Sequence, residues 1–204
     1  MEHEAPRTGA PVEASTEPTS SDRDTQVFNL FLGGNDEAYR TLYDLYERPL
    51  YLYIVRLVGG DAEAQDVFQE VWIRMYRLRG ERSSITRFSG LLYTVARNLS
   101  MNALRDRKVL PQISLEEVSA EQERTLRTRD VDDADLRELF ARALGQLPVA
   151  QREAFILREY NGYSYQEIAE ITATTMVTAK TRAWRAREGL RKMIAAWLDL
   201  RPKP

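Results

Sequence analysis

The sequence predicts an all-α protein built from two small helical domains joined by a flexible linker. Apolar residues recur at three- and four-residue steps through most of the chain, and no segment shows the strict alternation of a half-buried strand. This periodicity is lost over one long acidic stretch, which we expect to be the linker. A length of 204 residues suits one or two domains.

The predicted boundaries follow from changes in composition along the chain. Residues 1–23 are poor in apolar side chains and contain several prolines, so we expect a disordered tail there. The first domain should span residues 24–108, the linker residues 109–131, and the second domain residues 132–200.

The first domain should begin with a short helix over residues 24–32, which two glycines stop. Asn35 can cap a long second helix that runs to Val58, because tyrosines, leucines and an isoleucine follow it at helical spacing. Pro49 falls inside this helix, and a proline there predicts a kink or a break.

Two further helices complete the first domain. Asp61 is the predicted cap of the third helix, whose apolar stripe includes Trp72. Residues 79–87 lack periodicity and should form a loop, and the fourth helix should run from Phe88 to about Arg107.

The second domain should open with a helix over residues 133–145 and a second helix after Pro148, because proline is favoured in a first helical turn. A short third helix follows a capping box, in which the Ser164 hydroxyl accepts from a backbone N–H and the Glu167 carboxylate reaches back. Its buried stripe should consist of Ile168, Ala169 and Ile171.

The last helix should begin near Thr174 or Thr175, and it is strongly basic. A short capped helix, a tight turn and a basic helix are the sequence form of a helix-turn-helix, whose second helix enters the DNA major groove. Such one-sided charge favours a polyanion as partner, with a merely solvated face as the alternative. The basic residues, which are accompanied by the single acid Glu188, are Lys180, Arg182, Arg185, Arg187, Arg191 and Lys192.

Composition argues against an enzyme, because the chain has no cysteine and its one histidine, His3, lies in the predicted tail. We therefore expect no catalytic residue, no metal site, no cofactor and no small-molecule substrate. No apolar run approaches the ~20 residues that span a bilayer, so direct membrane insertion is not expected. The lack of cysteine fits a cytoplasmic location.

Four segments, taken in order, resemble the small extracytoplasmic-function (ECF) class of bacterial RNA polymerase sigma factors, within the sigma-70 family. Residues 61–72 are similar to the helix that binds core polymerase, and residues 92–99 to the helix that recognises the minus-10 promoter element. Residues 147–159 and 162–187 are similar to the minus-35-binding domain. The resemblance covers residues 24–198 and implies a subunit that directs core polymerase to promoters and assists the initiation of transcription.

The resemblance assigns residues to three surfaces. Those that would bind core polymerase are Asp61, Glu63, Asp66, Gln69 and Glu70. Those that would meet the minus-10 element are Ser83, Ser84, Arg87, Arg97, Asn98 and Arg105. Those that would meet the minus-35 element are Lys180, Thr181, Arg182, Arg185, Ser164 and Thr178. From the residues alone, a solvated helix face, a surface loop and helix-end cations remain the plainer interpretations.

The implied partners are core RNA polymerase, promoter DNA and an anti-sigma factor. The alternative function is a stand-alone helix-turn-helix regulator that binds a palindromic operator as a dimer, although the first domain then needs another explanation. Two single residues remain open. Trp184 lies among the basic residues, and core packing is favoured over contact with DNA or a partner. Ala173 replaces the turn glycine usual in the family, which predicts either a less strained turn or a positive φ at some cost.

Overall fold

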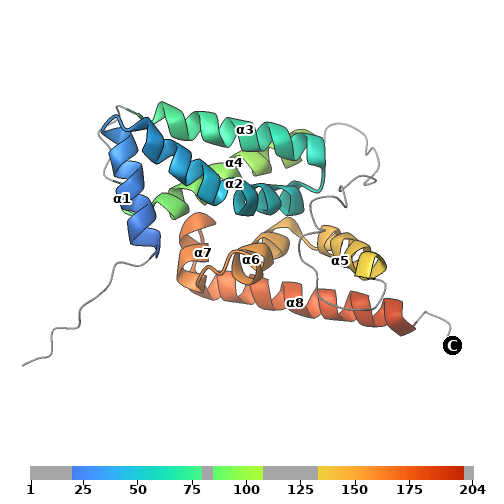
Figure 1. Cartoon of the computed structure of the whole chain (residues 1–204). Helices are drawn as coiled ribbons and strands as arrows, with labels where there is room; N and C mark the ends of the chain where they lie inside the picture. The colour runs from blue at the N-terminus through green and yellow to red at the C-terminus, as the bar shows by residue number, and fades with distance from the viewer. Residues whose placement is uncertain (1–19, 80–84, 108–132, 200–204) are drawn as a thin grey trace, which may run out of the picture.

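The computed structural model describes residues 20–79, 85–107 and 133–199, and this part of the chain holds eight α-helices and no strand. The predicted all-α fold is therefore confirmed. The helices are α1 (Ser20–Leu32), α2 (Asp36–Val58), α3 (Asp61–Arg77), α4 (Phe88–Arg107), α5 (Asp133–Gln146), α6 (Val149–Glu159), α7 (Tyr165–Ile171) and α8 (Met176–Asp199). Figure 1 shows them in two groups, which we call the N-terminal lobe (α1–α4) and the C-terminal lobe (α5–α8).

Helix α1 begins earlier than the sequence predicts. It starts at Ser20, so the last residues of the predicted tail belong to a helix. Further along α1, the Thr25 hydroxyl accepts a hydrogen bond from the backbone N–H of Phe88 at 3.0 Å and joins α1 to the start of α4. The rest of the predicted tail, and the predicted linker over residues 109–131, lie outside the described residues.

The predicted ends of α2 are confirmed. The Asn35 side chain accepts from the backbone N–H groups of Glu37 and Ala38, and Gly59 closes the helix in the left-handed conformation with φ 77°. Helix α2 continues through Pro49 without a break, and Figure 1 shows its two halves running in different directions, which agrees with the predicted kink.

The predicted cap of α3 is wrong by one residue. Gly60 occupies the cap position and Asp61 is the first helical residue. The Asp61 carboxylate therefore does not cap the helix. It accepts hydrogen bonds from Tyr51 on α2 and from Gln65 one turn further along α3, and an acid in a first turn also suits the helix dipole.

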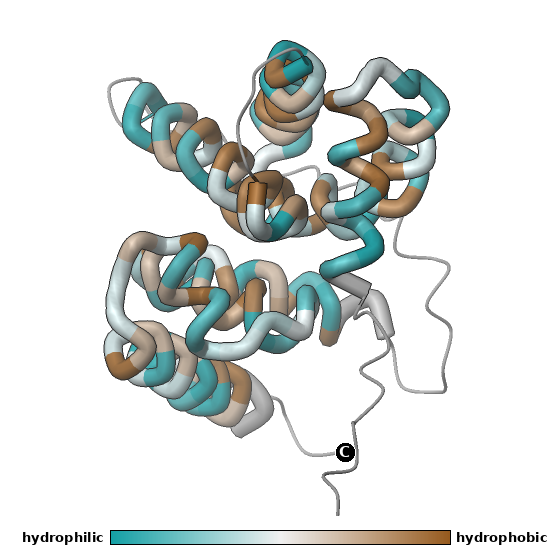
Figure 2. Tube along the Cα trace, turned by 90° about the vertical axis from the view of Figure 1, so that its left-hand side faces the viewer, coloured by the Kyte–Doolittle hydropathy of each residue, from teal (hydrophilic) through white to brown (hydrophobic). Residues whose placement is uncertain are grey.

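Aromatic side chains fill much of the N-terminal lobe. The rings of Phe28 and Phe88 lie 4.8 Å apart, which packs α1 against α4. The Tyr39 hydroxyl donates to the backbone carbonyl of Trp72 at 2.7 Å, and its ring meets Trp72 edge to face. Figure 2 shows the hydrophobic residues gathered where helices face one another. This core holds α3 and α4 in fixed positions.

The C-terminal lobe is built on a stripe of small residues. Ala179, Ala183 and Ala186 lie on one side of α8 and are buried. Because alanine has the smallest side chain that still favours a helix, Ile156 and Leu157 of α6 pack closely over this stripe. The opposite side of α8 is left to solvent.

Candidate nucleic-acid interface

The helix-turn-helix of the C-terminal lobe begins with the predicted capping box. The Ser164 hydroxyl accepts from the backbone N–H of Glu167 at 3.2 Å, and the Glu167 carboxylate accepts from the backbone N–H of Ser164 at 2.7 Å. Burial raises the pKa of Glu167, but these hydrogen bonds and the nearby Arg87 guanidinium outweigh it, so the pKa lies below its ordinary value of 4.5. The predicted capping box is confirmed. The predicted apolar stripe of α7 is buried, and it consists of Ile168, Ala169 and Ile171.

The sequence leaves two geometries open for the turn between α7 and α8, and the structure shows the strained one. Ala173 has φ 49°, in the left-handed region where a β-carbon is unfavourable. Helix α8 begins three residues later at Met176, and the Thr175 hydroxyl accepts from the backbone N–H of Thr178 at 3.1 Å. This cap fixes the first turn of α8, the part of a recognition helix that meets base edges.

The predicted minus-35 residues divide by exposure. Lys180, Thr181 and Arg185 are exposed on the solvent side of α8, whereas Thr178 and Arg182 are half-buried. Within the described residues, Lys180 and Arg185 have no carboxylate partner. Ser164 is exposed but lies at the start of α7 and serves the capping box.

Other cations of α8 are partly neutralised. Arg187 pairs with Glu159 of α6, and Arg191 pairs with Glu188 at 2.9 Å. Exposed pairs of this kind contribute little to stability, and they reduce the charge that a polyanion meets. Within the described residues, Lys180 and Arg185 in the first half of α8 and Lys192 in its second half have no carboxylate partner.

The prediction that Trp184 packs into the core is wrong. Its side chain is 58% exposed and lies on the same side of α8 as Val177, which is 69% exposed. The physical reason is the alanine stripe: Ala179, Ala183 and Ala186 already face the core, and a residue between them in sequence points away. Trp184 therefore lies among the exposed cations of α8.

The predicted minus-10 residues lie on the N-terminal lobe, and the structure separates them into two groups. Asn98 and Arg105 are exposed on α4, whereas Arg87 and Arg97 face the other lobe. Ser83 and Ser84 lie outside the described residues. The sequence did not indicate that two of these cations would be paired.

Arg97 of α4 lies against a buried acid of the C-terminal lobe. Its Nε is 3.0 Å from a carboxylate oxygen of Glu153, as an ion pair whose N–H is not aligned for a hydrogen bond. The Tyr53 hydroxyl donates to the same oxygen at 3.1 Å. The Glu153 side chain is 1% exposed, and burial raises its pKa even though Arg97, Tyr53 and Arg182 act in the opposite direction.

Arg87, at the start of α4, lies between two acids of α7. Its guanidinium pairs with Glu167 and, at 2.9 Å, with Glu170. A planar guanidinium suits such forked contacts with carboxylates or phosphates. The first helix of the helix-turn-helix is thus bound to the start of the predicted minus-10 helix.

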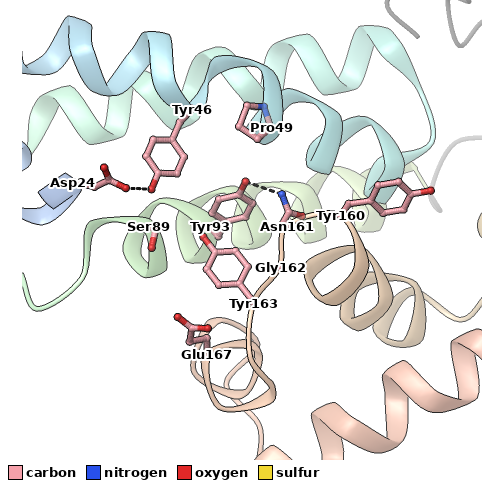
Figure 3. Close-up of a pocket in the computed structure, with 10 residues that line it drawn as sticks. All are labelled: Asp24, Tyr46, Pro49, Ser89, Tyr93, Tyr160, Asn161, Gly162, Tyr163 and Glu167. Carbon is pink, nitrogen blue, oxygen red and sulfur yellow. Dashed lines mark hydrogen bonds between the residues drawn. The ribbon is translucent and has the colours of Figure 1, made fainter. Parts of the chain in front are cut away.

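A cleft of about 340 Å³ lies along the junction of the two lobes, and tyrosines from both lobes line it. Figure 3 shows Tyr93 of α4 beside Asn161 and Tyr163, which lie between α6 and α7. The Asn161 amide donates to the Tyr93 hydroxyl at 2.9 Å, and the two tyrosine rings meet edge to face with centroids 5.2 Å apart. The junction is therefore both polar and aromatic.

The predicted polymerase-binding residues all lie on α3. Asp66 and Gln69 are exposed, and Glu70 pairs with Arg74 at 2.8 Å. Ile73 lies seven residues after Asp66, hence on the same face, and is 44% exposed. Sequence reasoning missed Ile73, although its position outside the buried stripe of α3 is a usable signal. Asp61 and Glu63 are half-buried nearer the start of the helix.

Comparison with known proteins decides the family. The families described as "Sigma-70 region 2" and "Sigma-70, region 4" match residues 42–109 and 137–190. The RNA polymerase sigma-H factor of Pseudomonas aeruginosa is 30% identical over 186 residues, which cover 86% of this chain and 95% of that protein. This chain belongs to the sigma-70 family. SigW of Bacillus subtilis, an ECF RNA polymerase sigma factor, is 30% identical over 172 residues (79% of this chain, 91% of SigW), so this sigma factor is of the ECF class.

Solved structures share the fold of this sigma factor. The structure of CnrH in complex with the cytosolic domain of CnrY superposes with a TM-score of 0.65 at 20% identity, covering 86% of this chain and 99% of CnrH. RpoE of Bartonella quintana, in complex with the anti-sigma factor NepR, gives 0.61 at 22% identity, with 77% and 96% covered. The two-lobed helical architecture is therefore an established sigma-factor fold.

Residues 20–79, 85–107 and 133–199 of this sigma factor contain neither a cluster of metal-ligand side chains nor a membrane-spanning helix. In those ranges no group of three or more histidine, cysteine, aspartate or glutamate side chains is arranged to hold a metal ion. No helix of the same ranges combines the length and the apolar character needed to cross a bilayer.

Proposed function

We propose that this sigma factor binds core RNA polymerase through α3, brings it to promoters with a minus-35 and a minus-10 element, and assists DNA opening. The single observation that carries the proposal is the solvent side of α8, where no carboxylate of the described residues pairs with Lys180 or Arg185, which lie near Thr181 and Trp184. Cations there bind phosphates or guanine edges, and the threonine methyl and the indole suit thymine methyl groups.

The role of α3 rests on its mixed surface. Asp66 and Gln69 lie on the turns of α3 that precede Ile73, so polar groups adjoin an exposed aliphatic side chain. Protein interfaces combine an apolar centre with a polar rim in this way. The same helix is anchored by the buried Trp72, which makes it a rigid platform for a partner protein.

Two further assignments extend the proposal. Relatives of this fold have been solved with an anti-sigma factor bound, which supports an anti-sigma partner here. A cytoplasmic location follows from the need to reach RNA polymerase. No catalytic role is assigned to any residue, because binding and positioning account for the groups described.

The test is run-off transcription from a library of genomic promoter fragments, with purified core RNA polymerase and the full chain. We expect new, discrete start sites that are lost with the double variant Lys180→Ala, Arg185→Ala. Arg142→Ala is the matched control, because Arg142 is an exposed cation of α5 that pairs with Glu138 on its own helix. Operator binding by the chain alone, with no added transcripts, would favour the stand-alone regulator instead.

A further inference from the structure

Two of the arginines assigned to promoter contact are already occupied within the chain itself. Arg87 is bound by carboxylates of α7, and Arg97 by a carboxylate of α6. Both arginines are only partly exposed: the side chains of Arg87 and Arg97 are 21% and 24% exposed. A phosphate that approached either guanidinium would have to displace a carboxylate.

The acids that bind these arginines come from the lobe that carries the recognition helix. Glu167 and Glu170 lie on α7, one helix before α8, and Glu153 lies on α6 beneath it. They present negative oxygens to guanidinium groups, which is the geometry that a nucleic-acid backbone presents. Carboxylates of the C-terminal lobe therefore occupy the positions next to both guanidinium groups.

We propose that the free chain adopts a self-locked state, in which carboxylates of the C-terminal lobe take the place of promoter phosphates on Arg87 and Arg97. We call the contacts of these two arginines with Glu153, Glu167 and Glu170 the interlobe lock. The lock extends the proposed function and rests on it. Its consequence is that the N-terminal lobe binds the minus-10 strand only after the lobes separate.

The chemistry of the junction makes the lock reversible. Glu153 is almost completely buried, and its charged form loses hydration that the contact with Arg97 only partly returns. Separation of the lobes rehydrates both groups, so opening does not leave a charge stranded. The aromatic contact between Tyr93 and Tyr163 and the stacking of Arg56 on Tyr160, at 3.9 Å, add attraction between the lobes beside the ion pairs.

The first test measures the distance between the lobes in the full chain, without DNA or polymerase. The chain has no cysteine, so Arg40→Cys on α2 and Lys192→Cys on α8, both exposed positions, place two spin labels specifically. Pulsed electron–electron double resonance should give one narrow distribution of distances between the two labels at low salt. A broad distribution in the otherwise unchanged chain would overturn the proposal.

Variants on the acidic side of the lock then release it. Glu170→Arg reverses a charge that faces Arg87, and Glu153→Gln removes a charge but keeps an acceptor for Tyr53. Combined, they should lengthen and broaden the distance. Glu138→Arg is the matched control, because it makes the same charge reversal on the same lobe at an acid that is 61% exposed and paired within α5. An unchanged distance in the double variant would overturn the lock.

Binding of a mixed-sequence single-stranded oligonucleotide tests the consequence. Apparent affinity scales with the binding-competent fraction, so the released variant should gain roughly fivefold to tenfold over Glu138→Arg. Adding Arg87→Ala should remove most of that gain, since the released arginine is then the group that binds. Equal affinities of the released variant and the control would overturn the inference.

The two proposals fail separately. A narrow distribution of interlobe distances together with no run-off transcription would support the lock and contradict the sigma-factor role proposed above. A broad distance together with promoter-specific transcription would do the reverse.

Discussion

On α8, Lys180 and Arg185 face solvent, whereas Arg87 and Arg97 of the N-terminal lobe lie against carboxylates of the C-terminal lobe. In the sequence these cations look alike, since each sits in or beside an amphipathic helix. Their environments differ because α8 turns its alanines inward and its cations outward, while α4 presents its arginines to a neighbouring lobe. A basic residue is thus available to DNA only if no internal acid already holds it.

The largest expected contrast is in stability. Arg97→Ala should lower the free energy of unfolding by about 2 kcal/mol, because it leaves the Glu153 carboxylate buried without its cation. Separation of the lobes limits the loss, since it lets water reach that carboxylate. Lys180→Ala should change stability by less than about 0.5 kcal/mol, because Lys180 is exposed and unpaired.

Urea denaturation followed by circular dichroism measures both changes on the full chain. Arg105→Ala serves as the matched control within α4, because Arg105 is exposed there. If Arg97→Ala and Arg105→Ala were equally stable, the buried ion pair would have no energetic role.

The next contrast is in affinity for duplex DNA. Arg185→Ala should weaken binding to a minus-35 duplex by about 1–3 kcal/mol, or roughly tenfold to a hundredfold, because a base-edge or phosphate contact is lost. Arg187→Ala should cost less, since Arg187 is already paired with Glu159. Fluorescence anisotropy with duplexes taken from the run-off start sites gives both values. A larger loss for Arg187 than for Arg185 would reverse the assignment of the DNA-facing side.

Local sequence signals were enough to predict most of the helices and their caps. The Asn35 cap and the Ser164–Glu167 capping box each depend on residues within one turn of each other. Such features are encoded locally, so the family resemblance and the physical pattern agree on them.

The contacts between the lobes could not be predicted in this way. Glu153 looks like a surface acid on an amphipathic helix, and its burial depends on Arg97 and Tyr53, which are far away in the sequence. Trp184 shows the opposite error, because a large apolar residue suggests core packing until the neighbouring alanines are known to fill the contact. Both outcomes are set by tertiary packing rather than by composition.

A smaller effect is the pH dependence of stability, which should have opposite directions for Glu167 and Glu153. The pKa of Glu167 lies below 4.5, so its contribution to stability is present above that value and is lost as the pH falls through the lowered pKa. Burial raises the pKa of Glu153, so the folded chain holds that proton more tightly and stability falls as the pH rises through the raised pKa. Each glutamine variant should remove one of these contributions when thermal unfolding is measured across the acidic pH range. Glu167→Gln should remove a rise of stability with increasing pH, and Glu153→Gln should remove a fall of stability with increasing pH.

The capping box gives a check that does not depend on pH. Ser164→Ala removes the acceptor for the Glu167 backbone N–H and should cost about 1 kcal/mol in the free energy of unfolding. Thr181→Ala is the control, because the Thr181 hydroxyl only donates back to the carbonyl of Val177 within the helix. Equal stabilities would mean that α7 is fixed by packing of its apolar stripe alone.

The smallest expected effect concerns the turn that precedes α8. Ala173→Gly should raise stability by about 0.5–1 kcal/mol, because relief of the left-handed strain exceeds the entropy that glycine loses on folding. Ala179→Gly should instead lower it by about 1 kcal/mol, since Ala179 lies inside α8 and is buried. Ala173 is exposed, and its backbone N–H donates to the backbone carbonyl of Glu170 at 3.3 Å, whereas Glu170 contacts Arg87 through its side-chain carboxylate. Thermal unfolding should therefore shift upward while the distance between spin labels on the two lobes stays the same, and a change in that distance would mean that the turn geometry and the lock are coupled.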